Sequence, residues 1–256
     1  MIRNEDIYSL PKVAAGYGRQ SDLQLPEETI LRLMLPHLPE FRMLDLGVGG
    51  GRTTLHFAKW AHEYVGADYS ESMIDECRRR FSGYPEHISF AVCDARSMRL
   101  FADGSFDFIM FSFNGIDYVP HADRAKIFKE IRRVGKPGGW FCFSTHNLNH
   151  SVQLFKLSRM ITLNPKRTAK RLLVRFLYNW RVRTAEVMRS RFAIINDGSH
   201  GRHLRTYYIR PLEQLSQLCQ DFTDVRVFSL NTGAQLDSHE LADVEDCWLY
   251  YLCKIR

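Results

Sequence analysis

A glycine-rich turn between an apolar run and a helix-like segment most constrains what this chain can fold into. From Arg42 to Thr54 the sequence is RMLDLGVGGGRTT, in which Asp45 closes the apolar run and glycines stand at 47, 49, 50 and 51. Glycine permits a sharp turn and leaves bare main chain against which a ligand can lie. A helix that follows would present unpaired N–H groups at its N-terminus. The segment therefore predicts a strand, a turn and a helix that bind a nucleotide-like ligand.

The spacing of these glycines separates two kinds of nucleotide site. A dinucleotide-binding turn needs Gly-x-Gly-x-x-Gly, but counted from Gly47 the third glycine position holds Arg52. The pattern Asp-x-Gly-x-Gly-x-Gly does fit, at Asp45, Gly47, Gly49 and Gly51. It resembles motif I of the class I S-adenosylmethionine (SAM) dependent methyltransferases. The resemblance implies SAM as the cofactor and S-adenosylhomocysteine as its product. A purely structural glycine turn and an NAD-dependent oxidoreductase are the alternatives.

Two more acids stand at the ends of expected strands. The segment 63–68 ends in Asp68, and the segment 88–93 is followed directly by Asp94. An acid at the end of the second strand can accept hydrogen bonds from both ribose hydroxyls of a bound adenosine. The resemblance implies that Asp94 meets the adenine amino group. Either acid alone could be an ordinary loop carboxylate, but three acids in successive strand–helix units favour a binding site.

The resemblance is strong over about residues 40–146 and weaker over 205–254. Residues 104–114 resemble the fourth strand of the family, and the Lys-Pro-Gly-Gly turn within 135–139 precedes an expected strand over 140–144. The other expected elements are helices over 26–35, 71–81, 123–134 and 209–219, and an antiparallel strand pair at the sheet edge over 225–230 and 247–252. We therefore expect an α/β fold with a doubly wound, seven-stranded, mostly parallel sheet, an antiparallel edge strand, and a helical and hairpin lid.

This pattern divides the chain into four expected parts. They are an N-terminal helical cap over 1–40, a SAM-binding core over 41–146, a basic helical and hairpin substrate lid over 147–205, and the C-terminal part of the core sheet over 206–256.

The lid has two expected elements. Asn164 and Pro165 are expected to begin a helix with an apolar stripe, formed by Leu173, Phe176, Leu177 and Trp180. Segments 192–196 and 203–209 are expected to form a β-hairpin.

The resemblance assigns further residues to the cofactor, besides the glycines and the three acids. In the leading segment, Tyr17 and Arg19 are candidates to approach the methionine carboxylate, with plain surface positions as the alternative. The other candidates lie close behind the expected second, third and fourth strands: Tyr69, Met73, Ala95, Arg96, Ser112 and Asn114.

The candidate catalytic residues are fewer, because SAM carries its own reactive methyl group and needs mainly alignment. His146, near the end of the fifth strand, is the candidate base, and Tyr118 is a second catalytic candidate. His200 and His203 in the hairpin are further imidazoles. Many relatives carry a histidine pair shortly after the fourth strand, where this chain has Asp117 and Tyr118. The base assignment therefore stays open.

The positive charge of the chain is concentrated in the expected lid. Residues 151–192 hold eleven Lys or Arg and one acid, whereas the rest of the chain holds 24 bases and 28 acids. Three interpretations are open. The segment is a solvated helix face, it guides an anionic small-molecule acceptor, or residues 156–191 contact nucleic acid or a membrane surface.

Composition limits the class of protein. A chain of 256 residues, 45% of them hydrophobic, suits one globular domain with an insertion. The sequence has no basic-then-apolar leader and no apolar run that would span a bilayer. Its six cysteines form no Cys-x-x-Cys pair. We therefore expect a cytoplasmic protein with free thiols and no metal site.

The expected function is methyl transfer from SAM to a nitrogen, oxygen or carbon nucleophile of a small molecule, which the basic lid would suit if that molecule is anionic. One alternative is a tRNA or rRNA methyltransferase that uses the basic lid. The other is a non-catalytic SAM-binding protein. The sequence indicates neither the acceptor nor the oligomeric state.

Overall fold

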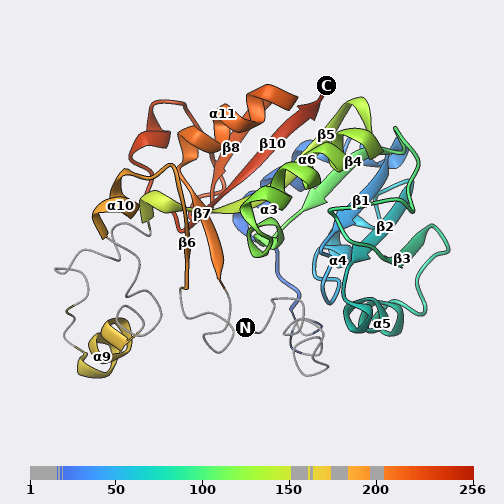
Figure 1. Ribbon diagram of the computed structural model, residues 1–256. Coiled ribbons are helices and arrows are strands. Elements are labelled where there is room, and N and C mark those ends of the chain that lie inside the picture. Colours follow the sequence, from blue (N-terminus) through green and yellow to red (C-terminus); the bar gives the residue numbers. More distant parts are fainter. Residues whose placement is uncertain are drawn as a thin grey trace.

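The computed structural model describes residues 16, 18, 20–150, 161, 164–173, 184–196 and 205–256 (Figure 1). The helices in these ranges, including three short 3-10 turns marked η, are α3 (Leu25–Met34), η1 (Leu38–Glu40), α4 (Thr54–Phe57), α5 (Glu71–Arg80), η2 (Gly115–Tyr118), α6 (His121–Val134), α9 (Pro165–Leu173), α10 (Thr184–Arg189), α11 (Pro211–Asp221) and η5 (Glu240–Ala242). The strands are β1 (Arg42–Leu46), β2 (Glu63–Asp68), β3 (Ile88–Val92), β4 (Phe106–Phe111), β5 (Gly135–Asn147), β6 (Phe192–Ile195), β7 (Thr206–Ile209), β8 (Phe222–Ser229), β9 (Gln235–Leu236) and β10 (Trp248–Ile255).

The described strands form one sheet whose main path is β3-β2-β1-β4-β5-β10-β8-β9. The first five of these strands are parallel, and β10 is antiparallel to both β5 and β8. Within the sheet, the first strand along the chain is β1. The strands β2 and β3 follow on one side of it, and β4 lies on the other side. This reversal is the doubly wound arrangement, and it places a binding crevice at the carboxyl ends of the strands. The expected mostly parallel α/β fold is confirmed.

One detail of the expected sheet is wrong. The sheet has ten strands in the described residues and not seven, because the hairpin β6–β7 and the short β9 join it. β4 stops opposite Phe143, and β7 takes its place beside β5 at His146 and Asn147. The expected antiparallel pair is formed by β8 and β10, and the two-residue strand β9, antiparallel to β8, is the edge.

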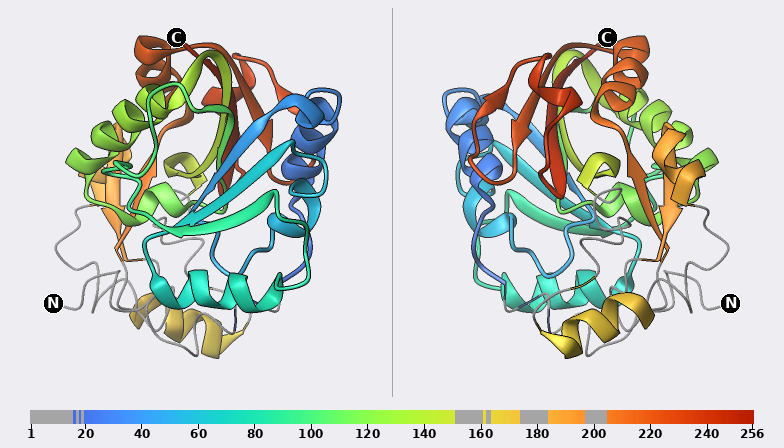
Figure 2. Two further views of the ribbon diagram at one scale, coloured as in Figure 1. Left: turned by 90° about the vertical axis from the view of Figure 1, so that its right-hand side faces the viewer. Right: turned by 90° about the vertical axis from the view of Figure 1, so that its left-hand side faces the viewer.

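Helices cover both faces of the sheet (Figures 1 and 2). On one face, α6 and α11 pack against the sheet through buried side chains that include Ile127, Ile131 and Leu218. On the other face, Ile30 of α3 and Phe57 of α4 belong to a second buried cluster. Successive residues of a strand point to opposite faces, so the near-continuous apolar strands supply both clusters.

One expected local feature changed, and another is confirmed. The turn expected over 135–139 is the start of β5, because Gly135 already pairs with Phe106 of β4. In the lid, Asn164 caps α9 as expected, since its side-chain oxygen accepts the backbone N–H groups of Lys166 and Arg167 at 3.0 and 3.3 Å.

The apolar stripe expected on that helix is described only at Leu173, which is 39% exposed. Its other three members, Phe176, Leu177 and Trp180, lie outside the described residues. Of the arginines in this segment, Arg167 is exposed. Among the helices that the structure describes, none is long and apolar enough to cross a membrane.

Candidate functional site

The glycine turn leads directly from β1 into α4 at the carboxyl edge of the sheet. Gly47, Gly49 and Gly51 have φ values of +60°, +55° and +78°, a region that residues with a side chain rarely adopt. An alanine at position 47 would place its Cβ 2.7 Å from Cε2 of Phe111, which is too close. The motif therefore keeps its glycines for backbone geometry and tight packing, and bare main chain faces the crevice.

Asp45 lies beneath this turn and is 1% exposed. Its Oδ2 accepts hydrogen bonds from the hydroxyls of Thr53 at 2.5 Å and Tyr64 at 2.6 Å. Burial raises the pKa of Asp45 to about 6, although both hydroxyls and the charge of Arg52 lower it. The carboxylate thus ties the end of β1 to the residue that precedes α4.

Asp68 ends β2 and holds the glycine turn from the neighbouring strand. Its Oδ2 accepts the backbone N–H of Gly49 at 3.0 Å and its Oδ1 accepts that of Ser70 at 2.9 Å. Burial raises its pKa. The backbone of Tyr69 is a third donor to this carboxylate. Since a carboxylate has about four acceptor positions, Asp68 retains capacity for a further hydrogen bond.

Asp94 follows β3 and is clamped by Arg96. The Arg96 guanidinium donates to Asp94 Oδ2 at 2.7 Å, and the Arg96 backbone N–H donates to Oδ1 at 2.8 Å. Partial burial alone would raise the pKa of Asp94, but the hydrogen bonds and charge of Arg96 lower it. Ala95 is partly buried against the core.

The remaining described cofactor candidates have different surroundings. Tyr69 is 39% exposed beside Asp68, whereas Met73 of α5 is buried. Ser112 is also buried, and its hydroxyl donates to Glu27 and contacts the hydroxyl of Tyr250 at 3.1 Å. Tyr17 and Arg19 lie outside the described residues, as do the hairpin histidines His200 and His203.

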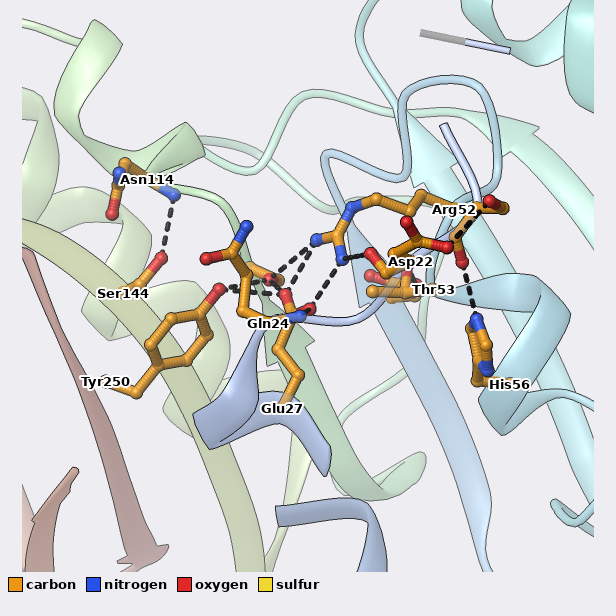
Figure 3. A network of polar contacts seen from close by, with 12 residues as sticks. Asp22, Gln24, Glu27, Arg52, Thr53, His56, Asn114, Ser144 and Tyr250 are labelled. Carbon is orange, nitrogen blue, oxygen red and sulfur yellow. Dashed lines mark hydrogen bonds and ion pairs between the residues drawn. The ribbon is translucent and has the colours of Figure 1, made fainter. Parts of the chain in front are cut away.

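Sequence reasoning missed a buried ion pair behind the glycine turn (Figure 3). Arg52 donates to both carboxylate oxygens of Glu27, at 2.5 and 2.7 Å, and also to the backbone oxygen of Asp22 at 3.0 Å. Glu27 is fully buried and also accepts the Tyr250 hydroxyl at 2.8 Å. Burial would raise the pKa of Glu27, but Arg52 and Ser112 lower it overall. The signal available in the sequence was Arg52 itself, a long cation directly after a glycine turn.

Asn114 lies beyond the end of β4 in the left-handed conformation. Phe113 and Asn114 have φ values of 55° and 61°. Asparagine tolerates this region, but a bulky residue such as Phe113 rarely adopts it, and such residues often accompany functional sites. The Asn114 backbone N–H donates to the Ser144 hydroxyl at 2.8 Å (Figure 3). Its side-chain oxygen is buried and has no hydrogen-bond partner in the described residues.

His146 lies near the end of β5 and is held by Asp117 of η2. Asp117 is 1% exposed, and its Oδ2 lies 2.7 Å from both the backbone nitrogen and Nδ1 of His146. Its Oδ1 accepts from Thr145 at 2.6 Å and from Arg124 at 2.7 Å. The ring of Tyr118 stands edge-on to His146, with centroids 6.5 Å apart. The two catalytic candidates are therefore neighbours, and sequence reasoning missed the link from His146 to Asp117.

The described residues contain no group of three or more His, Cys, Asp or Glu side chains that could hold a metal ion. All six cysteines are free.

Comparison with known proteins agrees with this arrangement. Residues 43–139 match the family model described as a methyltransferase domain. The chain is 34% identical over 134 residues to a demethylmenaquinone methyltransferase of Clavibacter sepedonicus, a match that covers 50% of this chain and 52% of that protein. It is 32% identical over 102 residues to a ubiquinone/menaquinone biosynthesis C-methyltransferase of Desulfotalea psychrophila, covering 38% of each. The chain thus spans about half or less of the length of these curated relatives.

Solved structures show the same fold over nearly the whole chain. A SAM-dependent methyltransferase from Mesorhizobium loti has a TM-score of 0.59 at 19% identity, covering 90% of this chain and 97% of that one. Phosphoethanolamine N-methyltransferase 2 of Haemonchus contortus, solved with S-adenosyl-L-methionine, has a TM-score of 0.61 at 18% identity, covering 99% and 58%. The fold, together with the glycine turn and the three acids at the carboxyl ends of the strands, defines a Rossmann-like methyltransferase domain. Residues 43–139 are thus similar in sequence to a methyltransferase domain, and the chain shares its fold with solved SAM-dependent methyltransferases.

Proposed function

We propose that this protein binds SAM at the carboxyl edge of β1, β2, β3 and β4 and transfers its methyl group to a small-molecule acceptor. The observation that carries the proposal is the meeting of three elements at that edge: the glycine turn, Asp68 and Asp94. Asp68 is held at the end of β2 by backbone N–H groups that include those of Gly49 and Ser70, which fixes the position of its carboxylate at this edge.

The residues fit an adenosyl group in chemistry as well as in position. Asp68 would hold the ribose, and Asp94 with Ala95 would meet the adenine. Partly exposed Tyr69 offers a ring face beside them. The bare main chain of the glycine turn would receive the methionyl part, and Asn114 offers an unpartnered buried oxygen nearby. When bound, SAM supplies a methyl group on a positively charged sulfur.

The site is built for binding and alignment, with His146 as the proposed proton acceptor. Holding two reactants in line can supply about 7–11 kcal/mol of the barrier, so the chain needs no nucleophile of its own. The relatives named above act on quinone precursors and on phosphoethanolamine by their names, and both types of acceptor are small molecules. An anionic acceptor would suit the basic residues 156–191, whose contribution is part of this proposal.

The test is calorimetric titration of the protein with SAM, S-adenosylhomocysteine and NAD. The first two should bind and NAD should not. Asp68→Ala should weaken SAM binding by about 1.5–3 kcal/mol, or about 10- to 150-fold in Kd, because charge-assisted hydrogen bonds to the ribose are lost.

The matched control is Asp75→Ala, which removes an exposed carboxylate of α5 that pairs only with Arg78 among the described residues. Its SAM affinity should equal that of the wild type. Binding of NAD without SAM would refute the proposed cofactor. If Asp68→Ala folds and binds SAM as tightly as the wild type, the ribose is held by other residues. Mass detection of a product 14 Da heavier, from metabolite pools incubated with SAM, then tests turnover.

A further inference from the structure

The end of β5 carries a group of aromatic side chains on one face of the sheet. In the sheet register, His146 pairs with Trp248 of β10 on one side and with Tyr208 of β7 on the other. Side chains of such pairs lie on the same face. Their rings are close to His146, with centroids at 5.8 Å for Trp248 and 4.8 Å for Tyr208. Phe113 stands edge-on to Trp248 at 6.1 Å.

One buried polar atom of this group has no partner. The indole Nε1 of Trp248 is buried without a hydrogen bond in the described residues. A buried donor that is left unpaired is unfavourable, so this N–H would suit a ligand that offers an acceptor.

The imidazole of His146 has a defined tautomer. A carboxylate only accepts, so the 2.7 Å contact with Asp117 places the proton on Nδ1. Within the described residues, the hydrogen bond that the ring makes is the one from Nδ1 to Asp117, which leaves Nε2 as its acceptor nitrogen. The charged groups described on this side are Asp117 from η2 and Arg124 from α6, which pair with each other at 2.7 Å.

Asp117 is held firmly in this role. Arg124, 3% exposed, donates to Asp117, to the backbone oxygen of Ile116 and to Gln214 of α11. With Thr145 and the His146 backbone, the carboxylate accepts four hydrogen bonds from protein groups. Its position is fixed by three elements of the fold, and the orientation of His146 is fixed with it.

We propose that the acceptor is a planar ring with an ionisable hydroxyl, bound against Trp248 and Tyr208, and that Asp117 positions His146 to take the hydroxyl proton. This inference rests on the proposed function and names the class of its acceptor. The hydroxyl proton goes to Nε2 of His146, and the imidazolium formed is paired with Asp117. The acceptor oxygen then bonds to the methyl carbon as the carbon–sulfur bond of SAM breaks, and that electron pair stays on sulfur.

The first test measures the tautomer and needs no ligand. In ¹⁵N-labelled protein, the imidazole shifts of His146 should show a proton on Nδ1, and Asp117→Asn should abolish this preference. Thr145→Val is the matched control, because it removes a hydrogen bond to the same carboxylate without touching the imidazole. It should keep the wild-type tautomer. A wild-type proton on Nε2 would overturn the proposal even if Asp117→Asn did not fold.

The second test uses 4-nitrophenol and 4-nitrocatechol, whose anions absorb visible light, added with and without S-adenosylhomocysteine. Binding should increase the anion absorbance at constant pH. His146→Gln and Asp117→Asn should weaken binding of the anion by about tenfold or more, as expected for a lost charge-assisted hydrogen bond. Trp248→Phe should weaken it less, since an aromatic face is kept although the N–H and the five-membered ring of the indole are lost.

Cyclohexanol is the non-aromatic control for these probes and should not compete with them. If the protein binds S-adenosylhomocysteine but neither ring probe, or binds both probes only as neutral phenols, the acceptor assignment fails and the proposed function stands. If the probes bind and S-adenosylhomocysteine does not, the proposed function fails instead.

Discussion

Replacing Arg52 by leucine should destabilise the fold strongly, because it leaves the buried carboxylate of Glu27 without its ion-pair partner. Glu27 is 0% exposed and has Arg52 as its ion-pair partner. Without that cation, Glu27 keeps only neutral donors: the Gln24 backbone and the hydroxyls of Ser112 and Tyr250. Removing one partner of a buried pair costs about 3–5 kcal/mol. For a chain of this size that corresponds to a fall in Tm of about 6–20 °C.

The assay is urea denaturation of the wild type, Arg52→Leu and the double variant Glu27→Gln/Arg52→Leu. The double variant should recover much of the loss, because no charge is then left buried. The loss in Arg52→Leu should also shrink as the pH falls. With Arg52 gone, burial raises the pKa of Glu27 above its unfolded value, so protonation then favours the folded state.

The control is Arg32→Leu on α3, the helix that carries Glu27. Arg32 is 72% exposed as a side chain and pairs with Glu28 at 3.8 Å, so its loss should change stability by less than about 1 kcal/mol. The reasoning is refuted if Arg52→Leu costs no more than Arg32→Leu, or if the double variant is as unstable as Arg52→Leu. Either result would mean that Glu27 does not stay charged in the folded protein.

Two further predictions concern pH and the basic segment. Burial raises the pKa of Asp45 from 3.8 to about 6, so its ionisation in the folded state opposes folding by about 3 kcal/mol once the pH exceeds both values. The stability of the wild type relative to Asp45→Asn should therefore fall as the pH rises from about 4 to about 6, and a flat or rising difference in urea titrations would contradict this. If Arg167, Arg171 and Arg175 attract an anionic acceptor, changing all three to Gln should raise the acceptor KM most at low salt and leave SAM affinity unchanged, since such charges are screened over about 8–10 Å. Loss of binding to RNA or anionic vesicles in pull-downs would favour those partners instead, and no change would indicate a solvated face.

The edge of the sheet could be predicted because its signals are local. Asp45, Asp68 and Asp94 each end or follow a short apolar strand, and parallel strands bring their carboxyl ends to one edge. No knowledge of distant contacts was needed for this. The three acids differ in their surroundings, however. The sequence could not indicate that Asp45 is buried beneath the turn, or that Arg96 forms an ion pair with Asp94.

The partners of Glu27 could not be predicted, because they depend on tertiary packing. In sequence, Glu27 is an acid in the first turn of a helix, where it favours the helix dipole. In the structure it meets Arg52, 25 residues away, and Tyr250, 223 residues away. The same limit applies to Asp117. The hydrogen bond between Asp117 and His146 forms because η2 follows β4, and β4 lies beside β5.

The position of β10 has a consequence for the order in which the protein can assemble. β10 is the last strand along the chain, yet it fills an interior place between β5 and β8. During synthesis both neighbours emerge first and expose unpaired backbone, and such edges invite pairing with other chains. The sheet becomes continuous only when residues 248–255 pair with both neighbouring strands. The same pairing places Trp248 beside His146. The continuity of the sheet and the aromatic face around His146 thus depend on the same strand.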